Sequence, residues 1–450
     1  MNRHSHLSRT RRPDRRRSLV IVVALGLALI QVVAAGAQEQ LPAQLTLTDC
    51  IRVALERNPQ LKASQQSVVS AAAGVTQARS GYYPQLSLRA GEGAAGSDNK
   101  TATGATGSSD GADVTLDMTL WRSGRMDAVG QSQASLRAAE WSHYDARQAL
   151  VEQVAGYYYA VLAARELVAV AQAGVDAAQQ HQQQVERQIE AGAAPEADIY
   201  TVNDDLAQAR LTLIDARSQA RVNLAQLKFV MGIHYTTDVQ LAPATMSADE
   251  SLPTEAEAVQ MALARRPDLL ASTDTVQARR YALAQARANR GPSLEVGGQY
   301  NRGYSDWGDG ASSWDVTAAM TWPLSDGGYT GAAYTAARAG LHSSKADLQT
   351  LTNQIALEVQ TALIELERTV ERIKAGDEAV AAARSRLRTA EVKYREGLGI
   401  LIEVTDARAA LTSAEAANVS ARFDHQVARI GLQRALGTLS LPDEGAEAPQ

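Results

Sequence analysis

Few of the residue types that commonly carry chemistry are grouped in this sequence. The seven histidines are scattered, and Cys50 is the only cysteine, so neither an internal disulfide nor a cysteine-based metal cluster can form. Glu403 and Asp406 lie three residues apart, a spacing that places both carboxylates on one side of a helix. The sequence contains no convincing phosphate loop, metal cluster or nucleophile–base set. We therefore predict no catalytic residue, no cofactor, no metal and no enzymatic activity.

We expect residues 1–37 to be a signal peptide. Seven arginines precede the apolar run Leu19–Val33, and the small residues Ala35–Ala37 supply a cleavage site. A nucleic-acid-binding tail is the alternative, which the apolar run directly after the arginines disfavours. Removing this segment, with its seven Arg and one Asp, changes the net charge from −6 to −12, and an acidic exported chain is not expected to bind nucleic acid. No later run of about 18 or more apolar residues predicts a transmembrane helix.

The chain repeats itself once, at nearly constant spacing. The matching pairs are Gly192 with Gly397, Asp198 with Glu403, Ile199 with Val404 and Leu206 with Leu411, at an offset of 205, and Pro59 with Pro267 and Pro84 with Pro292, at an offset of 208. We therefore predict a first repeat at 38–240, a second repeat at 241–437 and a short C-terminal tail at 438–450.

Apolar residues that recur every seventh position predict long helices of the coiled-coil type. A first helix is expected at Leu47–Tyr82, with a break before Pro59, because the residue that precedes a proline is disfavoured in a helix. Two longer helices, Met126–Glu190 and Tyr329–Glu396, each span roughly 65 residues, or about 100 Å. A tip turn and a shorter returning helix follow each of them. The predicted tip turns are 191–198 and 396–403.

Four segments alternate apolar and polar residues with a period of two, which predicts strands with one apolar face. The predicted strands are 84–90, 113–121, 292–302 and 313–323. Four of the five tryptophans lie in or beside these segments, as in the aromatic girdles of outer-membrane β-structure, with the packing aromatics of a soluble sheet as the alternative. The Gly- and Ser-rich segment Gly91–Ala112 and its shorter counterpart Gly303–Ser313 are predicted to be exposed loops.

Four strands cannot close a barrel, and an open strand edge is not tolerated in lipid. Several copies are therefore expected to assemble, and two, three or four of them would supply 8, 12 or 16 strands. The strand pattern does not choose among these. A periplasmic coiled-coil adaptor or structural protein is the alternative function, which shares the long helices but gives no reason for four alternating strands.

With this repeat, these strand entries and these tip glycines, the segment from Leu45 to Gly437 resembles the TolC family of outer-membrane efflux proteins, the outer membrane factors. The resemblance implies an α+β membrane protein of the cell outer membrane, with a periplasmic extension. In the family fold, a homotrimer forms a 12-stranded transmembrane β-barrel that continues into a 12-helix periplasmic α-barrel. The implied function is the exit channel of a tripartite efflux or type I secretion system, with a periplasmic adaptor and an inner-membrane RND or ABC transporter as partners.

The resemblance also implies roles for four residues near the two tip turns. Glu403 and Asp406 match the carboxylates of the periplasmic aperture, and three copies would place six acidic groups around the opening, favouring cations. Tyr394 matches the tyrosine of a latch, with Asp198 as its hydrogen-bonding partner. Surface carboxylates and a tyrosine at a helix end are the alternative interpretation of these four residues.

Two glycines in the tip turns complete the predicted site. Gly192 and Gly397 match the tip glycines that contact the adaptor in the family, and helix C-capping is a second role that they can fill at the same time. The sequence departs from the family pattern at 398–400, which contains no basic residue. A salt bridge from this turn across the aperture is therefore not expected.

Overall fold

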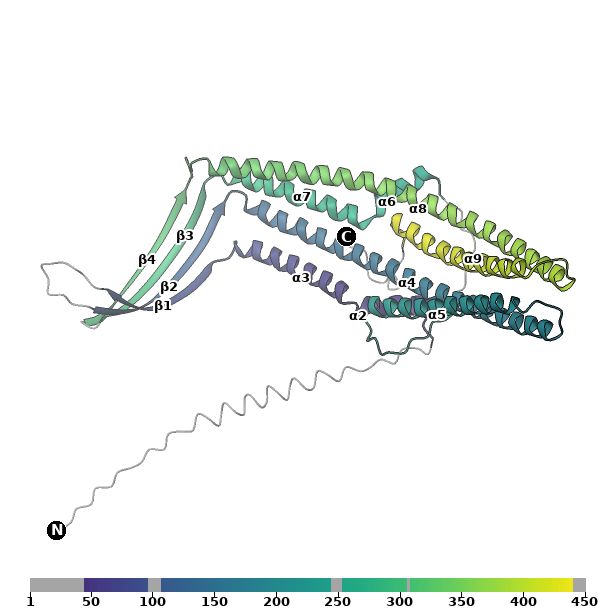
Figure 1. The fold of residues 1–450 in the computed structure, drawn as a ribbon. Coiled ribbons are helices and arrows are strands. Elements are labelled where there is room, and N and C mark those ends of the chain that lie inside the picture. Colours follow the sequence, from purple (N-terminus) through teal and green to yellow (C-terminus); the bar gives the residue numbers. More distant parts are fainter. Residues whose placement is uncertain (1–43, 96–106, 244–252, 306–307, 440–450) are drawn as a thin grey trace, which may run out of the picture.

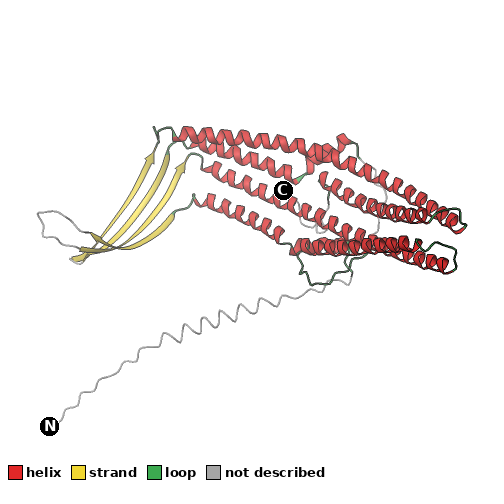
Figure 2. Ribbon diagram, in the orientation of Figure 1, coloured by secondary structure: helices red, strands yellow, loops and turns green. Residues whose placement is uncertain are grey.

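The computed structural model describes residues 44–95, 107–243, 253–305 and 308–439. The predicted signal peptide and all but the first two residues of the predicted tail lie outside this part of the chain. A four-stranded sheet occupies one end, and a bundle of long helices extends from it (Figures 1 and 2). The molecule is mostly helical with one small sheet, as the α+β prediction requires.

The helices of the described chain form two matching sets. The first set is α2 (Leu47–Arg57), α3 (Pro59–Ser80), α4 (Arg125–Glu190) and α5 (Asp198–Val230), and the second is α6 (Glu255–Arg265), α7 (Pro267–Ala288), α8 (Tyr329–Arg395) and α9 (Leu401–Ala435). The long helices α4 and α8 begin and end within one residue of the bounds that the seven-residue spacing predicts. Each helix of the first set has a counterpart of similar length in the second.

The helices pack as a layer whose two borders differ. Helix α4 packs along α3 and α5 and also along α7 and α9, and α8 packs along α7 and α9. Helices α3 and α5 follow each other along α4, and α7 and α9 follow each other along α8 (Figure 1). The layer therefore runs from α3 and α5, through α4, then α7 and α9, to α8, so α5 and α8 lie at opposite borders.

Helix α4 is the central element of this layer. Among the described helices it alone is long and apolar enough to span a membrane by length and composition, and 44% of that apolar window is buried. No run of about 18 consecutive apolar residues marks this window in the sequence, because polar residues interrupt it. Its buried Val154, Tyr158 and Val161 pack with Leu227 and Met231 in the same core cluster. A buried core helix has this composition without crossing a membrane.

Each of the two breaks before a proline separates two consecutive short helices, α2 from α3 and α6 from α7. Asn58 has the extended backbone expected before Pro59, and its side chain accepts hydrogen bonds from the backbone N–H groups of Gln60 and Leu61 at the start of α3. The Asn58 side chain also donates to the carbonyl oxygen of Val230, at the end of α5, over 2.8 Å. One asparagine therefore caps α3 and ties it to α5.

A glycine closes each of the two junctions. Gly232, after α5, and Gly437, after α9, both have φ of +66°. Each lies so close to the helix break within its own repeat that an added Cβ would meet backbone: 2.7 Å from the carbonyl oxygen of Arg57 at Gly232, and 3.0 Å from the carbonyl carbon of Arg265 at Gly437. Only glycine combines this backbone conformation with so close an approach.

We expect Gly232→Ala to destabilise the fold strongly, because the left-handed backbone costs roughly 1–2 kcal/mol for a residue with a Cβ and the clash adds to that cost. Gly156→Ala is the matched control, since Gly156 lies inside α4 with no atom within 4 Å of an added Cβ. That change should leave stability equal or raise it by up to about 1 kcal/mol. Thermal unfolding followed by circular dichroism measures both, and equal melting temperatures would contradict the junction's role.

The sheet consists of β1 (Gln85–Ala95), β2 (Gly107–Arg122), β3 (Ser293–Ser305) and β4 (Gly308–Thr321), antiparallel and in chain order. Its register keeps apolar and polar residues in separate rows. One row across the four strands is Leu86, Leu116, Gly298 and Val316, and the next is Ser87, Thr115, Gln299 and Asp315. Successive side chains point to opposite faces, so the sheet has one apolar and one polar face.

The strands are longer than the alternation predicts. The predicted loop 91–112 contributes to the ladder from both ends, since Gly91 pairs with Gly111 and Ala95 with Gly107. Much of the predicted loop 303–313 is also paired. Backbone N–H and C=O groups form the ladder, so pairing can continue through glycine and serine residues that build no apolar face. Only 96–106 and 306–307 of these loops lie outside the described residues.

Candidate functional site

The predicted site lies at the end of the helical bundle that is farthest from the sheet. Gly192 and Gly397 have φ of +70° and +73°, and each follows the end of a long helix. After α8, the N–H of Leu398 donates to the carbonyl oxygen of Lys393, and that of Gly397 to Tyr394. This pair of hydrogen bonds is a Schellman C-cap, which requires a residue with a left-handed backbone conformation. Both glycines are exposed with open space where a Cβ would be, so they are free for a contact as well.

Glu403 and Asp406 lie on the exposed side of α9. The residues between and beside them, Leu401, Val404 and Ala407, are buried against the neighbouring helices. Because those three define the packed face of the helix, the two carboxylates point together into solvent near the tip. The structure therefore places both predicted aperture residues on one accessible face.

Tyr394 lies in the contact between the two helical hairpins, α4–α5 and α8–α9. Its ring packs with apolar residues of both hairpins and meets the ring of His181 edge-on, with 6.2 Å between centroids. Burial, and secondly the negative charge of Asp198, raise the pKa of the Tyr394 hydroxyl. In the described part of the chain, Tyr394 makes no hydrogen bond to Asp198. The predicted latch pair is therefore close enough to interact electrostatically but is not hydrogen-bonded here.

A residue that the sequence analysis did not identify joins the two hairpins directly. The guanidinium of Arg408, on α9, donates to the carbonyl oxygen of Ala177 on α4 over 3.2 Å and to Glu391 on α8 over 2.9 Å. The Arg408 side chain is 16% exposed. The sequence indicates the role of Arg408 only through its position: the residue falls one turn after Val404, on the side of the helix that the apolar seam occupies. A charge there requires a buried partner.

Arg408 also faces acidic and titratable groups of the first hairpin. Burial raises the pKa of Asp205, on α5, and the positive charge of Arg408 opposes that rise. A groove of about 490 Å³ runs beside this contact, lined by α4, α5, α8 and α9. Small residues such as Gly174 and Ala409 form much of its wall. The two hairpins are therefore joined by the hydrogen bond of Arg408, beside a groove lined by small residues.

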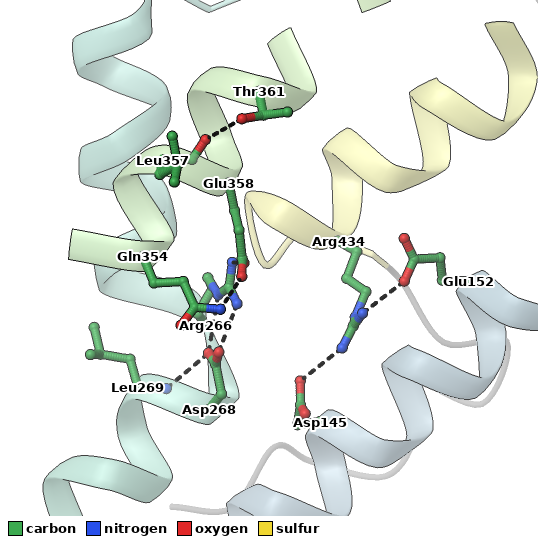
Figure 3. A network of polar contacts seen from close by, with 10 residues as sticks. All are labelled: Asp145, Glu152, Arg266, Asp268, Leu269, Gln354, Leu357, Glu358, Thr361 and Arg434. Atoms are coloured by element: carbon green, nitrogen blue, oxygen red, sulfur yellow. Dashed lines mark hydrogen bonds and ion pairs between the residues drawn. The ribbon is translucent and has the colours of Figure 1, made fainter. Parts of the chain in front are cut away.

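A second polar network lies halfway along the arms, where α7 and α9 meet (Figure 3). Arg434, near the end of α9, donates to Glu152 over 2.7 Å and lies 3.6 Å from Asp145, both on α4. Arg266, just before α7, contacts Glu358 on α8 over 2.5 Å. These ion pairs connect the break in the second repeat to both continuous helices. They are a structural counterpart of the single Asn58 tie in the first repeat.

No arrangement suited to a metal appears in the described ranges: they contain no group of three or more His, Cys, Asp or Glu side chains that could hold one ion. Cys50 is fully buried in the core, and burial raises the pKa of its thiol to about 12. A thiol in that state does not ionise near neutral pH, so Cys50 is an unreactive core residue.

The arrangement of a small sheet and long paired helices is shared with solved outer-membrane channels. The CmeC outer membrane channel of Campylobacter jejuni superposes with a TM-score of 0.77 at 18% identity, covering 87% of this chain and 85% of that chain. A membrane protein from Pseudomonas aeruginosa superposes with a TM-score of 0.76 at 22% identity, covering 87% and 90%. The chain therefore shares its fold with these solved membrane proteins.

Sequence comparison assigns the family. Residues 50–233 and 258–438 each match the model of the outer membrane efflux protein family. The outer membrane protein TolC of Vibrio cholerae is 22% identical over 88% of this chain and 92% of its own length, and TolC of Escherichia coli is 21% identical over 86% and 81%. The chain belongs to the outer membrane efflux protein family, as the resemblance predicted.

Proposed function

We propose that this protein is the outer-membrane exit channel of a tripartite efflux or type I secretion system, and that three copies form it. Membership of the outer membrane efflux protein family supports the location and the transport role. The main structural support is the sheet, which has an uncovered apolar face and two unpaired edges. A single protomer of this kind cannot stay in lipid, whereas a closed ring of copies can.

The apolar face of the sheet is open to the surroundings. Leu86 and Leu88 are both 72% exposed, and Trp314 on the opposite edge strand is 76% exposed. No helix of the described chain covers this face. Strands β1 and β4 are the edges, and each has one side without a partner strand. Lipid against the apolar face and a neighbouring copy at each edge satisfy both requirements at once.

Both borders of the helical layer expose apolar side chains that lack a packing partner within the described part of one chain. On α5, Leu206, Leu213 and Leu227 are buried, while Leu211 and Phe229 on the other side are 54% and 77% exposed. A helix with apolar residues on two faces needs packing partners on both. At the other border, Leu357 and Ile364 of α8 are also largely exposed. We therefore place α5 of one copy against α8 of the next. Three protomers of four strands would close a 12-stranded barrel, continued by a ring of twelve helical segments.

The partners follow from the same proposal. The exposed tips at Gly192 and Gly397 contact a periplasmic adaptor, which links the channel to an inner-membrane RND or ABC transporter. Tyr394 and Asp198 form a latch that strengthens when the aperture closes. Glu403 and Asp406 of three copies form an acidic ring at that aperture. Purified full-length protein should migrate as a heat-sensitive oligomer and conduct ions in planar lipid bilayers. A detergent-free, soluble monomer would contradict the proposal.

The acidic ring has its own test. Replacing Glu403 and Asp406 together by alanine removes six carboxylates from a trimer, so block of the ionic current by a trivalent cation such as hexaamminecobalt should weaken at least about tenfold. Glu371→Ala with Glu378→Ala is the matched control, because both are exposed acids of α8 away from the tip. Equal block in the ring variant and the control would reject the assignment.

A further inference from the structure

His181 is a buried titratable residue that the channel function leaves without a role. It lies on α4 in the contact between the hairpins α4–α5 and α8–α9, and it is 3% exposed. In the described residues, neither ring nitrogen of His181 has a hydrogen-bond partner, although both are shielded from solvent. Buried polar atoms without partners are rare and costly. The equivalent position in the second repeat, Arg386, is exposed, so this burial is specific to the central helix.

Charged and titratable groups of three other helices lie beside His181 or beside its neighbour Arg408. Helix α9 contributes Arg408, and α8 contributes Glu391 and the edge-on ring of Tyr394. Helix α5 contributes Asp205, which interacts with the same arginine. Glu391 accepts its hydrogen bond from Arg408, so its negative charge is already largely compensated. A proton added to His181 would therefore place a second positive charge beside Arg408 in a dehydrated contact.

The protonation equilibrium of His181 is coupled to closure of the contact. Burial, and secondly the charge of Arg408, lower the pKa of His181 to about 4, while Glu391 opposes this. When the hairpins separate, the ring meets water and its pKa returns toward about 6.5. The closed contact is therefore fully stable above about pH 6.5 and loses stability as the pH falls toward about 4, because the separated state binds the proton more tightly.

We infer that His181 makes the contact between the two hairpins proton-sensitive, so that acidification separates them and opens the periplasmic end of the channel. The inference rests on the proposed channel function for its consequence, but not for the separation itself. Titration between about pH 7.5 and about pH 5 should lower the ratio of closed to open hairpins on the order of 30-fold per chain.

Two substitutions separate charge from packing. His181→Gln cannot titrate in this range, so its conductance in planar bilayers should not change between about pH 7.5 and about pH 5, whereas the parent conductance should rise. His181→Lys should open the channel already at neutral pH, because it places a permanent charge in the contact. His342→Gln is the matched control, since His342 is an exposed histidine of α8. That variant should keep the acid response of the parent.

A distance measurement tests the separation without any conductance. Spin labels on Ala207→Cys in α5 and Ser385→Cys in α8, both exposed positions, report the hairpin distance by pulsed electron resonance, and buried Cys50 does not compete for label. Labelled chains are diluted with unlabelled full-length protein. The distance should lengthen in acid in the parent and stay constant in His181→Gln, with His181→Leu as a second non-titrating variant if the first folds poorly.

The outcomes distinguish the two proposals. An acid-dependent distance that requires His181, in a protein that conducts at neither pH, would overturn the channel function and leave the inference standing. Conductance whose acid response persists in His181→Gln and His181→Leu would overturn the inference and leave the channel function standing. A parent distance that does not change with pH would also overturn the inference.

Discussion

Replacement of Arg408 by methionine is expected to shift the channel strongly toward its open state. The change removes the hydrogen bond to Ala177, which crosses from one hairpin to the other, and the hydrogen bond to Glu391, which lies within the α8–α9 hairpin. A hydrogen bond to a charged group contributes about 2 kcal/mol, so the open-to-closed ratio should rise roughly 30-fold per chain. Methionine keeps most of the side-chain volume, so packing in the seam changes little. Single-channel conductance in planar bilayers measures the result.

Two comparisons show whether this effect comes from the position of the tie. Arg384→Met removes an ion pair with Glu415, but that pair lies within the α8–α9 hairpin, and the Arg384 side chain is 63% exposed. Its conductance should stay near that of the parent. Asp198→Ala with Tyr394→Phe should raise conductance by less than Arg408→Met, because no hydrogen bond joins that pair in this structure. If Arg384→Met and Arg408→Met conduct equally, Arg408 does not hold the hairpins together.

A charge on the exposed apolar side of α5 is expected to prevent assembly. Val222 and Phe229 are 49% and 77% exposed, on the side of α5 that faces away from α4. Val222→Asp with Phe229→Asp would bury two unpaired carboxylates in every contact between copies, at a cost of at least about 3 kcal/mol per contact. Light scattering after size exclusion in detergent should find monomers instead of trimers. Circular dichroism should still find the parent helix content.

Arg210→Asp is the matched control for the assembly variant. Arg210 is exposed on the same helix but outside the apolar stripe, so its replacement should leave the oligomer intact. Trimers that persist in Val222→Asp with Phe229→Asp would show that α5 does not form the contact between copies. Dissociation of the control as well would indicate a general effect of charge on this helix.

Most of the fold could be predicted because its signals are local and periodic. The seven-residue spacing located α4 and α8 to within one residue, since a coiled-coil seam repeats over the whole helix. Proline placed the breaks before α3 and α7 for a similarly local reason. The strand ends could not be predicted from alternation, because β1 and β2 continue through residues whose backbones pair without an apolar side chain.

The site was predictable only where it depends on the position of a residue within one helix. Glu403 and Asp406 share an exposed face, as their spacing indicates. The tie at Arg408 and the burial of His181 depend on how the second hairpin packs against the first, over more than 200 residues of separation. A contact between two separate hairpins leaves no periodic pattern in a single sequence. An arginine on an otherwise apolar seam was the one available indication.

The end-to-end joints at Gly232 and Gly437 have a mechanical consequence for the whole arm. Each joint interrupts a pair of short helices, while α4 and α8 continue past it as unbroken rods. A force applied at the tips is therefore carried to the sheet by two stiff members, and the interrupted members add little resistance to bending at mid-length. The arm should flex at the level of the joints and stay rigid on either side, so a pull on the tips is transmitted to the strands of the sheet.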